Sequence, residues 1–238
     1  MFEIPSLNIK ARTGVYANGQ ERVVQILETA LEILIQDGFS AVTLREIARR
    51  MDIRVSAINH YYSTREALVL DMLAGVLNSY EDFFERFRAP SDEPPEARLR
   101  AVMGVLLDDI MTLKTTRLFP ELWALANRDA TVARMIDVIY IRSRLILARF
   151  IALINPALDL RTRENLALLI SASLEGLTVF AGHGKPWQGE MERVKALACD
   201  GFVAMVKAAQ PLGQTDPDWR PPTLVDAETY ARLADLDG

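Results

Sequence analysis

The sequence is poor in the residues that build covalent links and metal sites. It contains one cysteine and two histidines among 238 residues. The single cysteine, Cys199, excludes an internal disulfide, which fits a reducing cytoplasm, and we expect it to be a small buried apolar residue. Two histidines and one cysteine cannot easily supply a zinc site. The sequence therefore gives no reason to expect a metal or another cofactor.

Sequence signatures of common enzymes are also missing. The chain has no G-x-G-x-x-G, no Walker loop, no G-x-S-x-G and no H-E-x-x-H. The run Gly182-His183-Gly184 reads as a loop rather than a phosphate cradle, and we expect His183 to lie at the end of a helix. We therefore expect no catalytic residues, and an enzyme is the weaker hypothesis.

Long uninterrupted apolar runs are absent as well. The first residues, Met1 to Pro5, lack the basic stretch and apolar run of a signal peptide. The most apolar segments are broken by Arg142, Arg144 and Arg149 or by Glu175, a pattern typical of buried amphipathic helices. We expect a cytoplasmic protein with no membrane-spanning segment.

The charge balance is mildly acidic, with a formal net charge of −5. Global electrostatics of this sign oppose a protein that coats nucleic acid without sequence preference. Residues 1 to 70 nevertheless hold as many Lys and Arg as Asp and Glu, so the acidity lies downstream. The net charge therefore does not exclude a local basic surface near the N-terminus.

Hydrophobic periodicity is helical along almost the whole chain, and no run alternates as a strand does. The sequence therefore predicts an all-α fold. The first helix ends at Gly38, two short helices follow, and a capping box at Ser63-Thr64-Arg65-Glu66 begins a long one. Proline-rich residues 89–95 separate it from the later helices. These are expected at 96–114, 118–127, 130–154, 161–181 and 189–209, with breaks at Pro120, Asn155-Pro156 and Gly182 to Pro186 and a short helix near 226–236.

The two short helices have the spacing of a helix-turn-helix. Thr43 and Glu46 form a capping box, in which each side chain is expected to bond the backbone N–H of the other residue. The buried stripe of the first helix consists of Leu44, Ile47, Ala48 and Met51, while Arg45, Arg49 and Arg50 make its other side basic. Asp52 and Ile53 form the turn. A second helix over 54–60 is too short to be stable alone, which indicates a packed module.

The stretch ILETALEILIQDGFSAVTLREIARRMDIRVSAINHYYSTREAL resembles the tetracycline-repressor (TetR) family of bacterial transcriptional regulators. The resemblance implies an N-terminal three-helix helix-turn-helix domain and a larger C-terminal helical domain that binds a small effector and forms a homodimer. We expect an N-terminal arm over 1–18, the DNA-binding domain over 19–66, the effector-binding and dimerisation domain over 67–210, and a tail over 211–238. The chain departs from the family habit at Asp52, Arg54 and Asn59, where Gly, Ser and Tyr are frequent.

The resemblance also implies roles for residues around the second short helix. Contacts to DNA phosphates are expected from Thr43, Tyr61 and Arg65, and contacts to bases or nearby backbone from Arg45, Val55, Ser56, Ala57, Asn59 and His60. Asn59 has the chemistry to pair with adenine, and Arg54 could reach guanine or a phosphate. Simpler roles remain open: Thr43 as a cap only, Tyr61 as a core aromatic beside an inward Tyr62, His60 as an ordinary surface residue, and the arginines as a solvated face.

In the larger domain, the resemblance implies an effector cavity and a dimer surface. Our candidates for ligand binding combine polar atoms or a large ring with helices that look interior: Trp123, Asn127, Arg142 and Glu175. The effector is expected to be small and largely apolar or amphipathic, with one polar or charged group. The helices near 161–181 and 189–209 are expected to form the dimer, which implies a palindromic operator in double-stranded DNA. Repression is the expected outcome; an activator, or a ligand sensor that has lost DNA binding, remains an alternative.

Overall fold

A computed structural model describes residues 4, 7–10, 17–211 and 219–235. Every regular element in these residues is a helix, which confirms the all-α prediction. The chain divides into two compact units. The N-terminal unit comprises Ile4–Tyr80 and Arg117–Met135, and the C-terminal unit contains Glu81–Thr116 and Ile136–Gly238. Of the predicted arm and tail, residues 1–3, 5–6, 11–16, 212–218 and 236–238 lie outside the described part.

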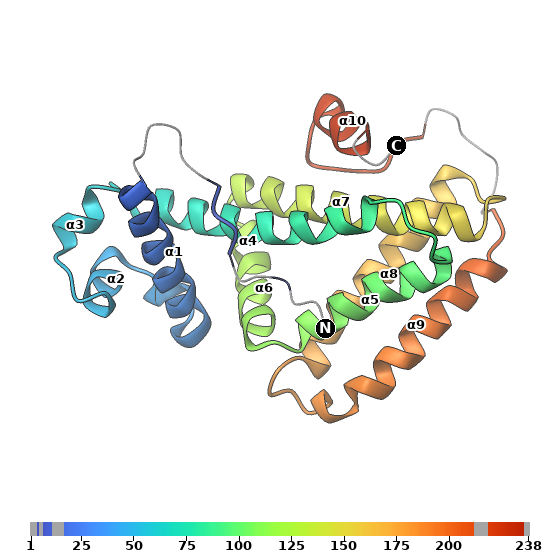
Figure 1. The fold of residues 1–238 in the computed structure, drawn as a ribbon, viewed down its shortest axis with the longest axis horizontal. Helices are drawn as coiled ribbons and strands as arrows, with labels where there is room; N and C mark the ends of the chain where they lie inside the picture. The colour runs from blue at the N-terminus through green and yellow to red at the C-terminus, as the bar shows by residue number, and fades with distance from the viewer. Residues whose placement is uncertain (1–3, 5–6, 11–16, 212–218, 236–238) are drawn as a thin grey trace. The chain divides into compact units, whose positions relative to one another are not determined.

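The N-terminal unit begins with the three-helix arrangement that the sequence predicts. Helix α1 spans Ala17–Asp37, the short 3-10 helix η1 Phe39–Ala41, α2 Leu44–Arg50 and α3 Val55–Asn59. Helix α1 packs against η1 and α2, and α2 packs against α3 (Figure 1). Their apolar stripes form one core. The side chains that recur every three or four residues along the helices are fully buried: Val23, Ile26, Leu27, Ala30, Ile47 and Ile58.

The end of α1 depends on Gly38. Its φ of 88° and ψ of 168° lie in a region that is open essentially to glycine only, rather than in the left-handed helical region that a glycine after a helix commonly adopts. The Gly38 N–H still donates to the Leu34 carbonyl at 3.0 Å, so the last turn of α1 is closed. The chain then leaves the helix direction at once and enters η1.

Helix α4 spans Arg65–Arg88, as the second capping signal predicts, but the cap differs by one residue. The Thr64 hydroxyl accepts from the Ala67 N–H at 3.2 Å, so Thr64 rather than Ser63 is the N-cap. The Asn8 N–H donates to the Gly75 carbonyl of α4 at 2.8 Å, and the Asn78 side chain donates back to the Asn8 carbonyl. Residues 7–10 of the predicted arm are thus irregular and lie along α4, whereas residues 17–18 already belong to α1.

Helix α6 spans Leu113–Ala126, so both its predicted start and the predicted break at Pro120 are wrong. The Thr112 hydroxyl accepts from the Thr115 N–H at 3.2 Å, and this cap starts the helix five residues earlier than expected. Pro120 lies inside the helix. A proline in the sequence is thus a less reliable sign of a helix boundary than the N-cap, here Thr112, that precedes it.

The C-terminal unit is built mainly from long helices. They are α5 (Pro95–Ile110), most of α7 (Ala130–Ile154), α8 (Leu160–Ala181) and α9 (Met191–Ala208), with the 3-10 helix η2 (Gln188–Glu190) and a terminal α10 (Ala227–Asp235). Helix α5 packs on α8 and α9 (Figure 1). Asp159 and Asp226 cap α8 and α10 by accepting from the Thr162 and Thr229 N–H groups, both at 2.7 Å. Helix α10 confirms the predicted terminal helix.

Helix α8 is the one helix among the described residues that is long and apolar enough to cross a membrane. Only 39% of its most apolar window is buried within this chain. Core helices of soluble proteins pass the same test of length and composition, so the finding is weak evidence for a membrane span. The exposed apolar residues on α8 include Leu168, Leu169, Val179 and Phe180.

We expect Gly38→Ala to lower the free energy of unfolding by about 1–3 kcal/mol, because an alanine would be held at a φ and ψ that suit only glycine. Thermal denaturation should show a loss of several degrees. Gly189→Ala is the matched control, since its φ is not positive and an added Cβ would meet nothing within 4 Å. Equal melting temperatures for the two variants would contradict the argument.

Candidate DNA-recognition surface and effector site

Helices α2 and α3 are joined by a tight turn whose geometry explains a departure from the family habit. Asp52 has a φ of 53° and is the one non-glycine residue with positive φ in the described part of the chain. Aspartate tolerates this conformation better than most residues. The Ile53 N–H then donates to the Ala48 carbonyl at 3.0 Å, which holds the turn against α2. The predicted turn at Asp52 and Ile53 is confirmed.

Helix α3 contains only five residues, and its inward side is held by the fully buried Ile58. The residues proposed to meet DNA lie on the solvent side of this module. The exposed ones are Thr43, Arg45, Arg54, Ser56, Ala57, Asn59 and His60. The half-buried ones are Val55, Tyr61 and Arg65. Exposure makes these side chains accessible to DNA but does not test their contacts with it, so their roles in DNA binding remain predictions.

The two tyrosines differ in burial. Tyr62 is 3% exposed, and its hydroxyl donates to the Asp71 carboxylate of α4 at 2.7 Å. Tyr61 is half-buried, and its ring meets His60 edge to face at a centroid distance of 5.1 Å. The inward Tyr62 is therefore part of the core. Sequence reasoning missed Asp71, because its position on the inner side of α4 only becomes clear once Tyr62 is placed.

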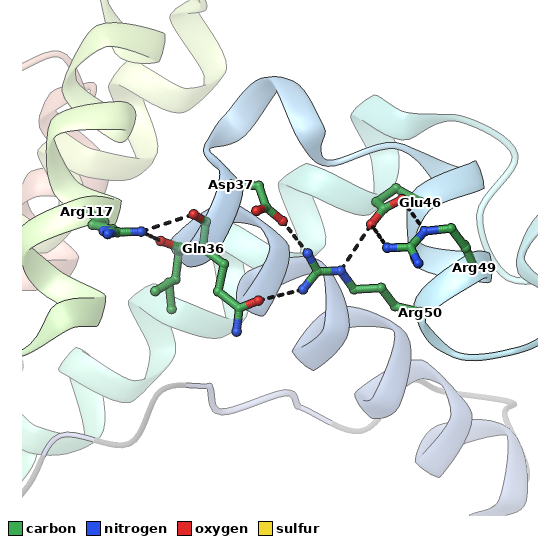
Figure 2. A network of polar contacts seen from close by, with 7 residues as sticks. Gln36, Asp37, Glu46, Arg49, Arg50 and Arg117 are labelled. Carbon is green, nitrogen blue, oxygen red and sulfur yellow. Dashed lines mark hydrogen bonds and ion pairs between the residues drawn. The ribbon is translucent and has the colours of Figure 1, made fainter.

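The arginines of α2 do not form one basic face. The Arg49 guanidinium donates twice to the Glu46 carboxylate, at 2.8 and 2.6 Å, and Arg50 donates to the same carboxylate at 3.1 Å (Figure 2). Arg45 and Arg54, by contrast, are exposed and have no hydrogen-bond or ion-pair partner among the described residues. The positive charge available to a phosphate is therefore concentrated on Arg45 and Arg54.

Glu46 explains why one half of the predicted capping box is wrong. The Thr43 hydroxyl accepts from the Glu46 N–H at 3.1 Å, as expected. The Glu46 carboxylate, however, turns toward Arg49 and Arg50 rather than back to the Thr43 N–H (Figure 2). Hydrogen bonds from these two guanidinium groups lower the pKa of the Glu46 carboxyl to about 2. Glu46 is therefore ionised throughout the neutral range.

The last turn of α1 receives two arginines from other helices (Figure 2). Arg50 of α2 donates to the Gln36 side chain at 2.7 Å and to the Asp37 carboxylate. Arg117 of α6 donates to the Ile35 and Gln36 carbonyls at 2.8 and 3.0 Å. These carbonyls lie at the helix end, where intrahelical donors run out. No sequence signal identified Arg117, which is distant in the chain from the helix it caps.

Arg65 has structural contacts at the position where the family resemblance implies a phosphate contact. Its guanidinium donates to the Phe39 carbonyl at 2.8 Å and to the Val42 carbonyl, and it lies 4.4 Å from the centre of the Phe39 ring. These contacts join the start of α4 to the η1 turn. Arg65 therefore supports the module, whether or not it also meets DNA.

The four effector candidates fall into both compact units. Trp123 is half-buried on α6 in the N-terminal unit, with its ring 6.1 Å from that of Phe119. Asn127 follows the end of α6 and is exposed, so the expectation that it faces an interior is wrong. In the C-terminal unit, Arg142 of α7 forms an ion pair with Glu81 of α4.

Glu175, the fourth candidate, lies on α8 in the C-terminal unit. Burial raises the pKa of its carboxyl to about 7, and the negative charge of Asp109 acts in the same direction. Asp109 itself is paired with Lys114 at 3.2 Å and accepts from the Thr115 hydroxyl at 2.7 Å. The Glu175 carboxyl makes no hydrogen bond or ion pair with another described residue. Within the described part of the chain it is thus a carboxyl group without a countercharge.

We expect Arg65→Ala to lower the free energy of unfolding by about 1–3 kcal/mol, because the Phe39 and Val42 carbonyls lose their donor. Urea denaturation measures the change. Arg45→Ala is the control and should stay within about 0.5 kcal/mol of the wild type, since Arg45 is exposed and unpaired. If Arg45→Ala destabilised the protein as much as Arg65→Ala, the structural role of Arg65 would be refuted.

The chain is similar in sequence to known regulators. Residues 26–72 match the family model for bacterial regulatory proteins of the tetR family. The chain is 26% identical over 152 residues to the HTH-type transcriptional regulator BetI of Burkholderia thailandensis, which covers 63% of this chain and 77% of that protein. An uncharacterised HTH-type regulator of Xanthobacter autotrophicus is 29% identical over 117 residues, covering 45% of this chain and about half, 54%, of the relative.

The fold is shared with solved structures at low sequence identity. A transcriptional regulator from Saccharomonospora viridis, in complex with choline, aligns with a TM-score of 0.64 and 16% identity over 79% of this chain and 97% of that chain. The family model covers the same α1 to α4 segment in which the helix-turn-helix geometry is found, and the remaining helices follow the architecture of these regulators. Residues 26–72 are therefore a DNA-binding segment of the kind found in bacterial regulatory proteins of the tetR family, and the described helices share the fold of solved regulators.

Proposed function

We propose that this TetR-family regulator is a repressor that binds a palindromic operator and releases it when a small effector binds. The observation that carries the proposal is the α2–α3 module, whose outer residues are exposed while Ile58 holds its inner side. The unpaired cations Arg45 and Arg54 flank the same module. A short helix supported in this way has the form that enters the major groove in helix-turn-helix proteins.

The residues on the outer side of the α2–α3 module and just after it would make different contacts with DNA. Asn59 can donate to and accept from adenine in a bidentate pair, and Arg54 can read guanine or neutralise a phosphate. Thr43 and Tyr61 carry hydroxyls suited to phosphate oxygens. The net charge of −5 makes a local rather than a global attraction to DNA necessary.

A homodimer through α8 and α9 would complete the DNA-binding unit. Leu168, Leu169, Val179 and Phe180 of α8 and Leu197 of α9 are each at least half exposed in the single chain. Apolar side chains gathered in this way on neighbouring helices favour association. Two-fold symmetry would present two copies of α3 to half-sites about one helical turn apart, which is why we propose a palindromic operator.

The effector would bind in the C-terminal domain, with Glu175 and Arg142 as the candidate residues of the C-terminal unit. A structural relative has been solved with choline, a small amphipathic molecule, and this supports a small-molecule effector. Binding can release DNA only by favouring the conformation with lower DNA affinity. Operation on chromosomal DNA places our proposed regulator in the cytoplasm.

Two alternatives of the same fold lead to different results. An activator would bind its operator and raise transcription when the effector is present. A sensor that has lost DNA binding would enrich no DNA at all. The unpaired Arg45 and Arg54 favour DNA binding over its loss, and a reporter gene behind the recovered operator separates repression from activation.

The test is a selection from sheared genomic DNA of the source organism at near-physiological salt, followed by sequencing of the retained fragments. We expect a few sites that share an inverted repeat. The control is Asn59→Ala with Arg54→Ala in one chain. Failure of the wild type to enrich any site, both as purified and after refolding free of ligand, would refute the proposed function.

For base recognition, we expect Asn59→Ala to lose about 1–3 kcal/mol of discrimination at one adenine position of the operator, because the bidentate pair is removed. Tyr61→Phe, which removes only a hydroxyl suited to phosphate, should weaken all operator variants by a similar factor. Fluorescence anisotropy with a set of single-base operator variants measures both. A uniform loss in both variants would contradict this division of roles.

For dimerisation, we expect Leu197→Glu to shift the protein toward monomer by at least tenfold in dissociation constant, because a charge would be buried in the proposed apolar interface. Size-exclusion chromatography with light scattering gives the mass across a dilution series. Leu224→Glu is the control, since Leu224 is 63% exposed but lies outside α8 and α9. A Leu197→Glu protein that stays dimeric like the control would rule out this interface.

A further inference from the structure

One side of α8 carries three polar side chains that have no partner among the described residues. Ser171, Glu175 and Thr178 are spaced four and then three residues apart, so they lie one above another on the helix. We call these three residues the α8 polar stripe. Thr178 is 1% exposed, and neither its hydroxyl nor that of Ser171 has a hydrogen-bond partner among the described residues. The Glu175 carboxyl likewise makes no hydrogen bond or ion pair with the described residues.

Another serine of the same helix shows how a hydroxyl group can find a hydrogen-bond partner within α8. The Ser173 hydroxyl donates to the Leu169 carbonyl one turn earlier, at 2.7 Å. This bond is the usual way for a helical serine or threonine to satisfy itself. The Ser171 and Thr178 hydroxyls do not form this bond, although Ser171 is half-buried and Thr178 is buried. Buried polar atoms without a partner are rare, and a bound molecule is one of the few things that completes them.

The charge around the stripe favours a cation. Asp109 acts on Glu175 as a like charge, and its own countercharge, Lys114, is engaged with it at 3.2 Å. An anionic ligand would meet two carboxyl groups, and a neutral ligand would leave Glu175 without a countercharge. The described residues contain no cluster of His, Cys, Asp or Glu that could hold a metal ion. An organic cation is the occupant that fits all three facts.

We propose that the α8 polar stripe is the polar end of the effector site, and that the effector is a small organic ammonium compound whose charge pairs with the Glu175 carboxylate. The Ser171 and Thr178 hydroxyls, on either side, would bond to a polar group beside the ammonium centre. This inference rests on the proposed effector-controlled function and names the chemical class of its ligand. It assigns Glu175 a direct contact with the ligand.

The proposal carries a pH dependence with a definite sign. Burial raises the pKa of the Glu175 carboxyl to about 7, so much of the free protein is protonated there below neutral pH. A cation binds the ionised form, so its affinity should increase as the pH rises toward 7 and level off above it. Asp109 is the other charged group that acts on Glu175, and it is itself paired with Lys114.

The test is isothermal titration calorimetry of the full-length protein with tetramethylammonium, choline and benzyltrimethylammonium. Each is paired with its uncharged carbon isostere, which for choline is 3,3-dimethylbutan-1-ol. We expect at least one ammonium compound to bind at least tenfold more tightly than its isostere. Titrations at pH 7 in buffers of different ionisation enthalpy should show release of about half a proton per ligand, because the carboxyl with a pKa of about 7 must ionise.

Two variants separate the site from general effects on the fold. Glu175→Gln should lose at least tenfold in affinity for the ammonium compound and should abolish the proton release. Glu164→Gln is the matched control, because Glu164 likewise lies on α8 with a pKa raised by burial but has Arg144 as a nearby cation. It should bind like the wild type. Thr178→Val provides a second variant with a smaller loss should Glu175→Gln fail to fold.

The outcomes distinguish this inference from the function on which it rests. Binding of none of the ammonium compounds, or equal binding of a compound and its isostere, overturns the cation assignment. An equal loss in the Glu175 and Glu164 variants overturns the assignment of the site. The genomic DNA selection tests the regulator itself, so enrichment of an inverted repeat without ammonium binding would refute only the ligand class.

Discussion

The C-terminal turn of α1 is the point on which the N-terminal unit depends. A helix end leaves carbonyl groups without donors and carries a partial negative charge, which favours cations there. In this chain Arg117 of α6 donates to two of those carbonyls, while Arg50 of α2 holds the Gln36 and Asp37 side chains (Figure 2). Three helices are therefore joined at one turn. The position of α2, and through it that of α3, follows from these contacts.

The same contacts decide which arginines of the α2–α3 module are left without an ion-pair partner and are therefore available to a DNA phosphate. Arg49 and Arg50 are engaged with Glu46, whose pKa is lowered to about 2 by their hydrogen bonds, so this group stays ionised and keeps both arginines in place. Arg45 and Arg54 remain without partners in the described chain. The useful positive charge of the surface is thus a consequence of pairing, and a count of arginines in the sequence overestimates it.

Helix α8 serves two surfaces with opposite chemistry. Its exposed residues Leu168, Leu169, Val179 and Phe180 are apolar, whereas the polar residues Ser171 and Glu175 are half-buried and Thr178 is buried. In an ordinary surface helix the apolar side faces the core and the polar side faces water. Exposure of these apolar residues explains why only 39% of the most apolar window of α8 is buried within this chain. This arrangement is also what a helix requires when one side is to be covered by a second chain and another is to hold a polar ligand.

The sequence by itself determined the all-α fold, most helix boundaries and the helix-turn-helix, because helical periodicity, caps and glycines act within a few residues of one another. Thr43, Gly38 and the turn at Asp52 are examples. It could not determine which arginines are free, since Arg65 and Arg117 bond carbonyls of residues more than twenty positions away. It also could not show that Glu175 lacks a countercharge or that Asn127 is exposed. Burial and pairing depend on distant segments meeting in space, and only the tertiary structure decides that.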